Sequence, residues 1–139
     1  MFLTEKELKE AFWKKYNYSN RAKRYQFECP LREGNTDLVT VELFQDEYQI
    51  NCFEFKLNDI KKAILQAKAN IPYCNKSWIV VPIEKRELLQ NRYEFKLKEL
   101  KHIGVIGVHE SGRWEIIHRP LFQKEVILNQ ALIKMMMLV

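Results

Sequence analysis

Apolar residues recur at two spacings along the chain, and the spacing changes from segment to segment. Leu8, Phe12 and Tyr16 repeat every four residues after Thr4, which begins a capping box, so the pattern predicts a helix over about 4–16. Three stretches rich in β-branched and aromatic residues follow, and turn-forming pairs separate them. The stretches are 25–31, 38–44 and 48–56, joined through Gly34-Asn35 and Gln45-Asp46. This order predicts a helix and then a three-strand meander.

Helical spacing returns after the meander. Asn58 is a predicted N-cap for a helix that carries Ile60, Ala63, Ile64 and Ala67 on one face and ends before Pro72. The short apolar run at 77–82 then has the composition of a strand covered on both faces. The later predicted elements are the strand at 77–82, a helix over 83–100 and a hairpin over 102–118 that turns at Ser111-Gly112.

These elements together predict an α/β (α+β) fold in a single domain over residues 1–139. A helix between two strands, in a unit whose last strand is buried on both faces, indicates a parallel crossover, so the sheet is expected to be mixed, with about four to six strands flanked by helices. The core is expected over about 4–82, and a helix-hairpin-helix extension over about 83–139.

Composition narrows the class of protein. With 47% hydrophobic and 29% charged residues the chain is expected to be globular and to have one real core. A net charge of +5 suits an anionic partner such as nucleic acid. Three widely spaced cysteines predict neither disulfides nor a zinc cluster, and no signal sequence is recognisable, which favours the cytoplasm.

The last segment, 121–139, is apolar but broken by Asn129, Gln130 and Lys134, and is too short and polar to span about 20 residues of bilayer. No membrane association is expected. The segment is expected to be a packed helix or the interface of a homodimer.

Charged residues at the ends of two predicted strands form the candidate site. A hairpin of 38–44 and 48–56 would place Asp37 beside Glu54, and Lys56 would share the face of Glu54. Two converging carboxylates repel each other, and Mg²⁺ (or Mn²⁺) would relieve the repulsion. Lys56 could orient the attacking water or offset charge on a phosphate, so the set suits phosphodiester hydrolysis.

Asp37, then Glu54-x-Lys56, then a helix and the strand "WIVVP", resembles the PD-(D/E)xK nuclease superfamily over about residues 4–82. The resemblance implies a restriction-endonuclease-like fold and a metal-dependent nuclease, a hydrolase of the endonuclease type, with Asp37 and Glu54 as metal ligands. It also implies that Glu28 is the extra strand acid of some small members, and that Gln66 is the helix glutamine that contributes to their active site. Thr36 stands where the superfamily name has proline.

Simpler structural interpretations remain open for four of these residues, namely Asp37, Glu54, Lys56 and Gln66. Glu54 and Lys56 could be an ion pair on an edge strand, Asp37 a turn residue, and Gln66 a polar position on the outer face of a helix. The stretch Glu54–Leu57 recurs letter for letter as Glu94–Leu97 in a charged helical segment, where it is expected to be a solvated face.

The function expected from the sequence is cleavage of nucleic acid, with DNA favoured over RNA. The basic residues expected to hold phosphates are Arg21, Lys23, Arg24, Lys61 and Lys62. Two alternatives stay open. One is a nucleic-acid-binding module that does not cleave, and the other is an interaction protein that offers its basic surface to an acidic partner.

Overall fold

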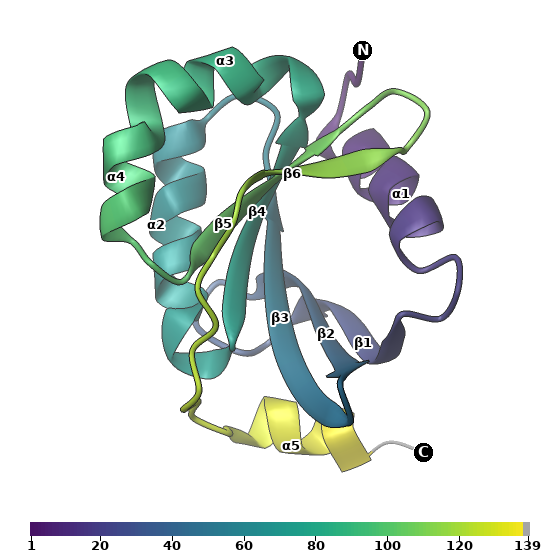
Figure 1. Ribbon diagram of the computed structural model, residues 1–139. Coiled ribbons are helices and arrows are strands. Elements are labelled where there is room, and N and C mark those ends of the chain that lie inside the picture. The colour runs from purple at the N-terminus through teal and green to yellow at the C-terminus, as the bar shows by residue number, and fades with distance from the viewer. Residues whose placement is uncertain (138–139) are drawn as a thin grey trace.

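A single mixed sheet forms the centre of the molecule in the computed structural model, which describes residues 1–137. Six strands lie in the order β1-β2-β3-β4-β5-β6, the order of the chain itself (Figure 1). The pairs β1/β2, β2/β3 and β5/β6 are antiparallel, and β3/β4 and β4/β5 are parallel. The predicted α+β class and the mixed sheet are confirmed.

The strands are β1 (Ala22–Cys29), β2 (Thr36–Phe44), β3 (Glu47–Phe55), β4 (Lys76–Pro82), β5 (Ile103–Val108) and β6 (Trp114–His118). The α-helices are α1 (Glu5–Tyr16), α2 (Ile60–Asn70), α3 (Arg86–Leu88), α4 (Glu94–Glu99) and α5 (Gln130–Met137). A π-helical turn, Leu89–Tyr93, joins α3 to α4, and 3₁₀ turns lie at Ile71–Tyr73 and Ile83–Lys85.

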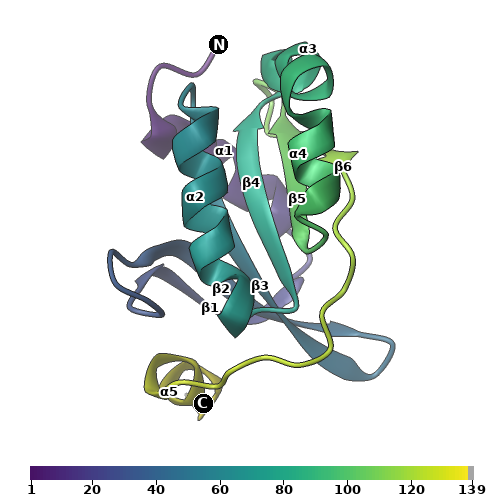
Figure 2. The same cartoon turned by 90° about the vertical axis from the view of Figure 1, so that its left-hand side faces the viewer.

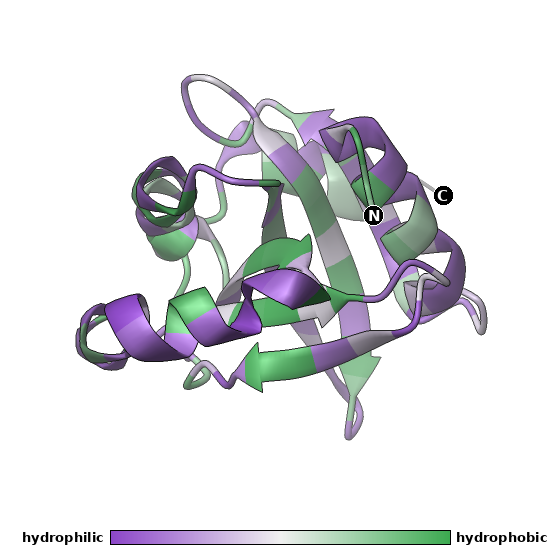
Figure 3. Ribbon diagram, turned by 90° about the horizontal axis from the view of Figure 1, so that it is seen from above, coloured by the Kyte–Doolittle hydropathy of each residue, from purple (hydrophilic) through white to green (hydrophobic). Residues whose placement is uncertain are grey.

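Helices cover the two faces of the sheet. Helices α2 and α4 lie on one face and α1 lies on the other, while α5 packs at one end (Figure 2). Under α1, the buried side chains of Leu8 and Phe12 meet Phe53, Phe55 and neighbouring strand residues. Hydropathic colouring from above shows the apolar residues concentrated on the strands between the helices (Figure 3). The sheet therefore has an apolar core on each face.

The helix starts follow the capping rules, with one correction. Thr4 is the N-cap of α1 and its hydroxyl accepts a hydrogen bond from Glu7 N–H at 3.1 Å, as predicted, and Glu7 accepts one from the Leu3 N–H in return. The predicted N-cap of α2, Asn58, is wrong. Asp59 caps that helix, because its carboxylate accepts from Lys62 N–H at 3.1 Å.

The segment 83–100 is less regular than its predicted helix. The predicted apolar positions are confirmed, since Leu89 and Leu97 are both buried in the core between α2 and the sheet. However, one 3₁₀ turn, two short α-helices and the π-helical turn between them replace a continuous α-helix. The predicted hairpin after it is confirmed and extends the main sheet, since β5 pairs with β4.

The chain after β6 crosses back along the molecule to α5. Gly104 permits the crossing, since a Cβ there would lie 2.6 Å from Pro120 Cδ. Asn129 then fixes the start of α5, because its amide donates to Leu31 O at 2.5 Å and its side-chain oxygen caps Leu132 N–H at 3.0 Å. Through residue 137, no helix has the length and apolar character that crossing a bilayer requires.

Candidate active site

The register between β2 and β3 brings the two predicted acids together. Leu38 pairs with Phe53, so the next residues outward, Asp37 and Glu54, stand opposite each other. Directly opposed residues of an antiparallel pair project from the same face of the sheet. The register follows from the two-residue turn Gln45-Asp46, where both residues have positive φ (51° and 66°), as a tight hairpin needs.

Asp37 is held in place by the backbone of the neighbouring strand. Its Oδ2 accepts a hydrogen bond from the Phe55 N–H at 2.9 Å, and the residue is half-buried. Phe55 follows Glu54, so this bond anchors the first acid beside the second.

Glu54 is fully buried and its two oxygens differ in their surroundings. Oε2 accepts hydrogen bonds from Arg32 Nη2 at 3.0 Å and from Asn70 Nδ2 at 2.9 Å. Oε1 is buried as well, and no group among residues 1–137 hydrogen-bonds to it. A buried carboxylate oxygen without a partner is costly, so a ligand for Oε1 is expected.

The groups around Glu54 Oε2 form a closed network. Asn70 Oδ1 accepts from Arg32 Nε at 2.6 Å and from Thr36 Oγ1 at 2.8 Å, which fixes the amide so that its NH₂ faces Glu54. We call Arg32, Thr36, Glu54 and Asn70 the carboxylate clamp. The clamp joins the β1–β2 loop, the start of β2, the end of β3 and the end of α2.

Burial and the neighbouring Asp37 carboxylate raise the pKa of Glu54 to about 7, although Asn70 and Arg32 oppose the shift by hydrogen bonds and charge. A positive ion between the two carboxylates would remove the repulsion that contributes to this shift. The donor set therefore fits a small hard cation, with Asp37 and Glu54 Oε1 as its protein oxygens.

Across residues 1–137 no group of three or more His, Cys, Asp or Glu side chains is placed to hold an ion. A cation at Asp37 and Glu54 would thus need most of its ligands from water, substrate or backbone oxygens, which suits Mg²⁺.

Lys56 lies just past the end of β3 and its ammonium faces α1. The side chain is 11% exposed, and Nζ lies 4.0 Å from Glu5 Oε1, at the limit of an ion pair. Glu5 is half-exposed, so this pair holds Lys56 only weakly. Lys56 is therefore nearly buried, and its ammonium contacts the first turn of α1.

Gln66 lies on α2, one turn before Asn70 of the clamp. Residues four apart share one face of a helix, so Gln66 is on the face that reaches Glu54. Its Oε1 is buried and, within the described chain, lacks a hydrogen-bond partner. Two buried oxygens without partners, Glu54 Oε1 and Gln66 Oε1, thus belong to the predicted site residues.

Glu28 stands in β1 between the pairs Phe27–Leu38 and Cys29–Thr36, which places it across from Asp37. Its φ of 49° is in the left-handed region, where a non-glycine residue is strained. The Glu28 side chain is exposed, and its position near the two acids is given by the register of β1 and β2.

The predicted phosphate-binding residues do not form one patch. The Arg21 guanidinium lies over the rings of Tyr16 and Trp114, on the α1 side of the sheet. Lys23 and Arg24 line a hollow beside Tyr48 and Met136. Lys61 and Lys62 lie in the first turn of α2, on the opposite face, where Lys61 borders a groove with Lys68, Arg92 and Lys96.

The sequence reasoning missed Arg32 and Asn70. Asn70 carried a signal, because it follows Gln66 by four residues on the same predicted helix. Arg32 lies in the loop before Gly34-Asn35, and nothing in its spacing pointed to Glu54.

Comparisons with known proteins give the fold and no activity. Neither a protein-family model nor a curated protein matches the chain. Among solved structures, the SPO1766 protein of unknown function from Silicibacter pomeroyi has a similar fold, with a TM-score of 0.59 and 14% sequence identity. The match covers 91% of this chain and 78% of that one.

Proposed function

We propose that the protein is a Mg²⁺- or Mn²⁺-dependent nuclease of the PD-(D/E)xK type, acting on DNA. The observation that carries the proposal is Glu54 Oε1, buried without a partner beside Asp37 on the adjacent strand. An oxygen that already accepts hydrogen bonds, as Glu54 Oε2 does, has no need of such a ligand. The order of elements around the site, a helix, three strands, a helix and a strand, agrees with that superfamily.

Each residue at the site has a defined task in this proposal. Asp37 and Glu54 Oε1 hold the divalent ion, which when bound polarises the phosphoryl oxygen and lowers the pKa of a water. Arg32 and Asn70 keep Glu54 Oε2 occupied, so that Oε1 is the oxygen left to bind. Lys56 orients the attacking water or offsets charge on the phosphate.

Glu94 is a matched control residue for the catalytic test of Glu54. Glu54 and Glu94 stand in identical tetrapeptides, but Glu94 lies on α4, where it forms an exposed pair with Lys98 at 3.3 Å. With plasmid, linear, single-stranded and branched DNA plus Mg²⁺ or Mn²⁺, we expect Glu54→Gln, Asp37→Asn and Lys56→Ala to lower cleavage at least about 100-fold, as removal of a single electrostatic group can. Glu94→Gln should cleave normally. Equal cleavage by Glu54→Gln and Glu94→Gln would refute the proposal.

A second candidate is a module that binds nucleic acid without cleaving it. The contact between Lys56 and Glu5 favours this candidate, because within residues 1–137 the ammonium pairs with the first turn of α1 and not with a strand acid. It predicts salt-dependent DNA binding that Lys56→Ala leaves unchanged, with no product under any metal. An interaction protein for an acidic partner instead predicts neither metal binding by calorimetry nor salt-dependent affinity for DNA.

We also propose a homodimer formed through the C-terminal segment and a cytoplasmic location. The apolar side chains of Leu121, Phe122, Ile127, Leu128 and Ile133 are 43–61% exposed, which is the composition of an interface. Three free, buried cysteines suit a reducing compartment. Analytical ultracentrifugation of the native chain and of Ile133→Lys tests the dimer, which should dissociate in the variant.

A further inference from the structure

Aromatic side chains line the seam between α1 and β1. The ring centroid of Trp13 lies 4.7 Å from that of Tyr25 and 5.3 Å from that of Phe27. The ammonium of Lys9 lies 5.4 Å from the centre of the Phe27 ring. We call Lys9, Trp13, Tyr25 and Phe27 the aromatic seam.

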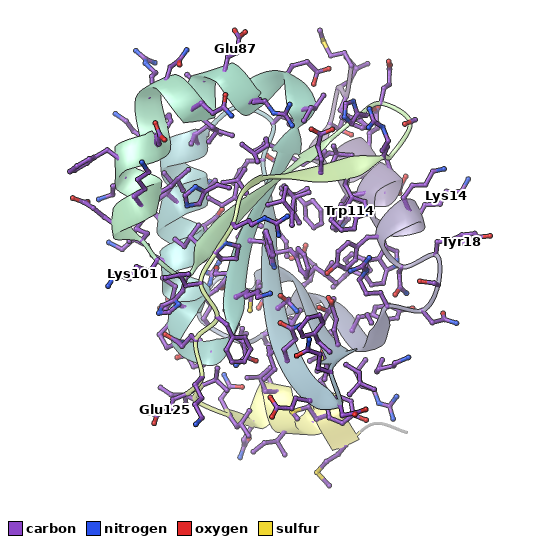
Figure 4. All side chains as sticks on the ribbon, in the orientation of Figure 1. Lys14, Tyr18, Glu87, Lys101, Trp114 and Glu125 are labelled. Carbon is purple, nitrogen blue, oxygen red and sulfur yellow. The ribbon has the colours of Figure 1, made fainter. Side chains whose placement is uncertain are left out.

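The seam remains open to solvent. Tyr25 is 50% exposed, and Lys9, Trp13 and Phe27 are half-buried. β1 is the outermost strand of the sheet, so within residues 1–137 no further strand covers this side. Lys14 on α1 and Tyr18 in the turn after α1 project into solvent (Figure 4). At this sheet edge the Tyr25 side chain is therefore accessible, and those of Trp13 and Phe27 are accessible in part.

The seam is linked to the candidate active site through Lys56, which contacts the first turn of α1. Glu5, Lys9 and Trp13 are four residues apart and follow one face of α1. Glu5 is the residue that Lys56 contacts, so the seam starts at the site and Trp13 lies about 12 Å further along the helix axis. On β1, Phe27 pairs with Leu38, whose side chain lies in the core under α1, so the seam is on the face of the sheet opposite to Asp37 and meets the site at the end of β3.

Cations and rings alternate along this path. Lys9 accompanies Phe27, and beyond Trp13 the Arg21 guanidinium lies 4.9 Å from the centre of the Tyr16 ring. Tyr16 and Trp13 are themselves stacked, with centroids 6.4 Å apart. Unpaired bases stack on exposed rings, and phosphates pair with the cations between them. A duplex keeps its bases stacked inside and would leave the ring faces unused.

We propose that the aromatic seam binds a single-stranded segment of nucleic acid that leads away from the site, with bases on Trp13 and Tyr25 and backbone phosphates near Lys9 and Arg21. The inference rests on the proposed function and adds its substrate class, a nucleic acid with an unpaired strand next to the scissile bond. Sequence is not read, because every base has a stacking face.

The test is fluorescence anisotropy of labelled oligonucleotides in EDTA, where cleavage cannot occur. One oligonucleotide is a 12-nucleotide oligo(dT) and the other has the same length and charge but abasic sites in place of the bases. The native chain should bind oligo(dT) at least about five-fold more tightly than the abasic strand. Tyr25→Ala and Trp13→Ala should each remove most of this difference, and Tyr25→Phe and Trp13→Phe should retain it.

Phe95→Ala is the matched control, because Phe95 is an exposed aromatic residue (77%) on α4, on the other face of the sheet. It should leave both affinities unchanged. Equal binding of the two oligonucleotides, or equal losses in Phe95→Ala and Tyr25→Ala, would overturn the proposal. Should Trp13→Ala fail to fold, the half-exposed Tyr25 decides the result.

The two proposals fail in different ways. If the seam is wrong but the nuclease is right, the native chain cleaves DNA while the base-dependent difference in anisotropy is absent. If the nuclease is wrong but the seam is right, the difference is present in EDTA and no metal yields product.

Discussion

Asn70 donates a hydrogen bond to Glu54 Oε2 at 2.9 Å and so ties the last residue of α2 to the buried acid of β3. The amide is fully buried and accepts two further bonds, from Arg32 and Thr36. The helix that follows the acid in sequence thus returns to fix the orientation of that acid.

Asn70→Ala should lower the free energy of unfolding by about 2 kcal/mol, because it leaves buried groups on Arg32, Thr36 and Glu54 without a partner. Urea denaturation measures the change. Asn91→Ala removes an exposed amide and is the control. Similar losses in both variants would show that the clamp contributes nothing.

Arg32 and Glu54 should be energetically coupled. Their side chains are 11% and 1% exposed, so water screens the pair poorly. In a double-mutant cycle of Arg32→Gln and Glu54→Gln, we expect a coupling free energy of about 2 kcal/mol in the stabilising direction. The exposed pair Glu94 and Lys98 should show none above experimental error. A coupling for Arg32 and Glu54 no larger than that of the surface pair would contradict the prediction.

The raised pKa of Glu54 should make stability fall as the pH rises. With a folded pKa of about 7 against an ordinary value of 4.5, the unfolded chain loses this proton first, so the protonated carboxyl favours the folded state below about pH 4.5. That advantage is lost progressively up to about pH 7, and it amounts to about 3 kcal/mol.

Glu54→Gln, which cannot ionise, is the reference for this measurement. The free energy of unfolding of the native chain, relative to the variant, should decrease between pH 4.5 and 7 and level off above. A difference that is constant with pH would show that Glu54 titrates normally. Mg²⁺ should restore stability to the native chain above pH 7 and leave the variant unaffected.

Helix α5 should stabilise the sheet through one face only. Leu132 is fully buried with Met135 against Val39, Cys52 and their neighbours, whereas Ile133 is 43% exposed. Leu132→Ala should therefore cost about 3 kcal/mol and Ile133→Ala less than about 1 kcal/mol, measured by urea denaturation of the native chain and both variants. Equal costs would mean that α5 does not dock in this way.

The pairing of Asp37 with Glu54 could be predicted because it depends on local rules. A two-residue turn and the alternation of side chains determine the register between β2 and β3, and both are visible in the sequence. Two other local patterns, a capping box and a helix between two strands, predicted the helix start at Thr4 and the mixed sheet.

The surroundings of those acids could not be predicted, because they depend on how distant elements pack. Arg32 is 22 residues from Glu54 and lies in a loop, where no periodicity gives the direction of a side chain. The contact of Lys56 with Glu5 likewise depends on where α1 docks. The π-helical turn at Leu89–Tyr93 keeps the apolar spacing of a helix, so the pattern alone could not reveal it.

Strand order that follows chain order has a consequence for synthesis on the ribosome. Each new strand adds beside the one made just before it, and all members of the carboxylate clamp lie between Arg32 and Asn70. The emerging chain can therefore assemble the clamp before β5, β6 and α5 have been translated, since nascent chains fold from the N-terminus at the pace of elongation. The apolar side chains of β1, β2 and β3 that pack against α5 would then stay exposed until α5 has been translated.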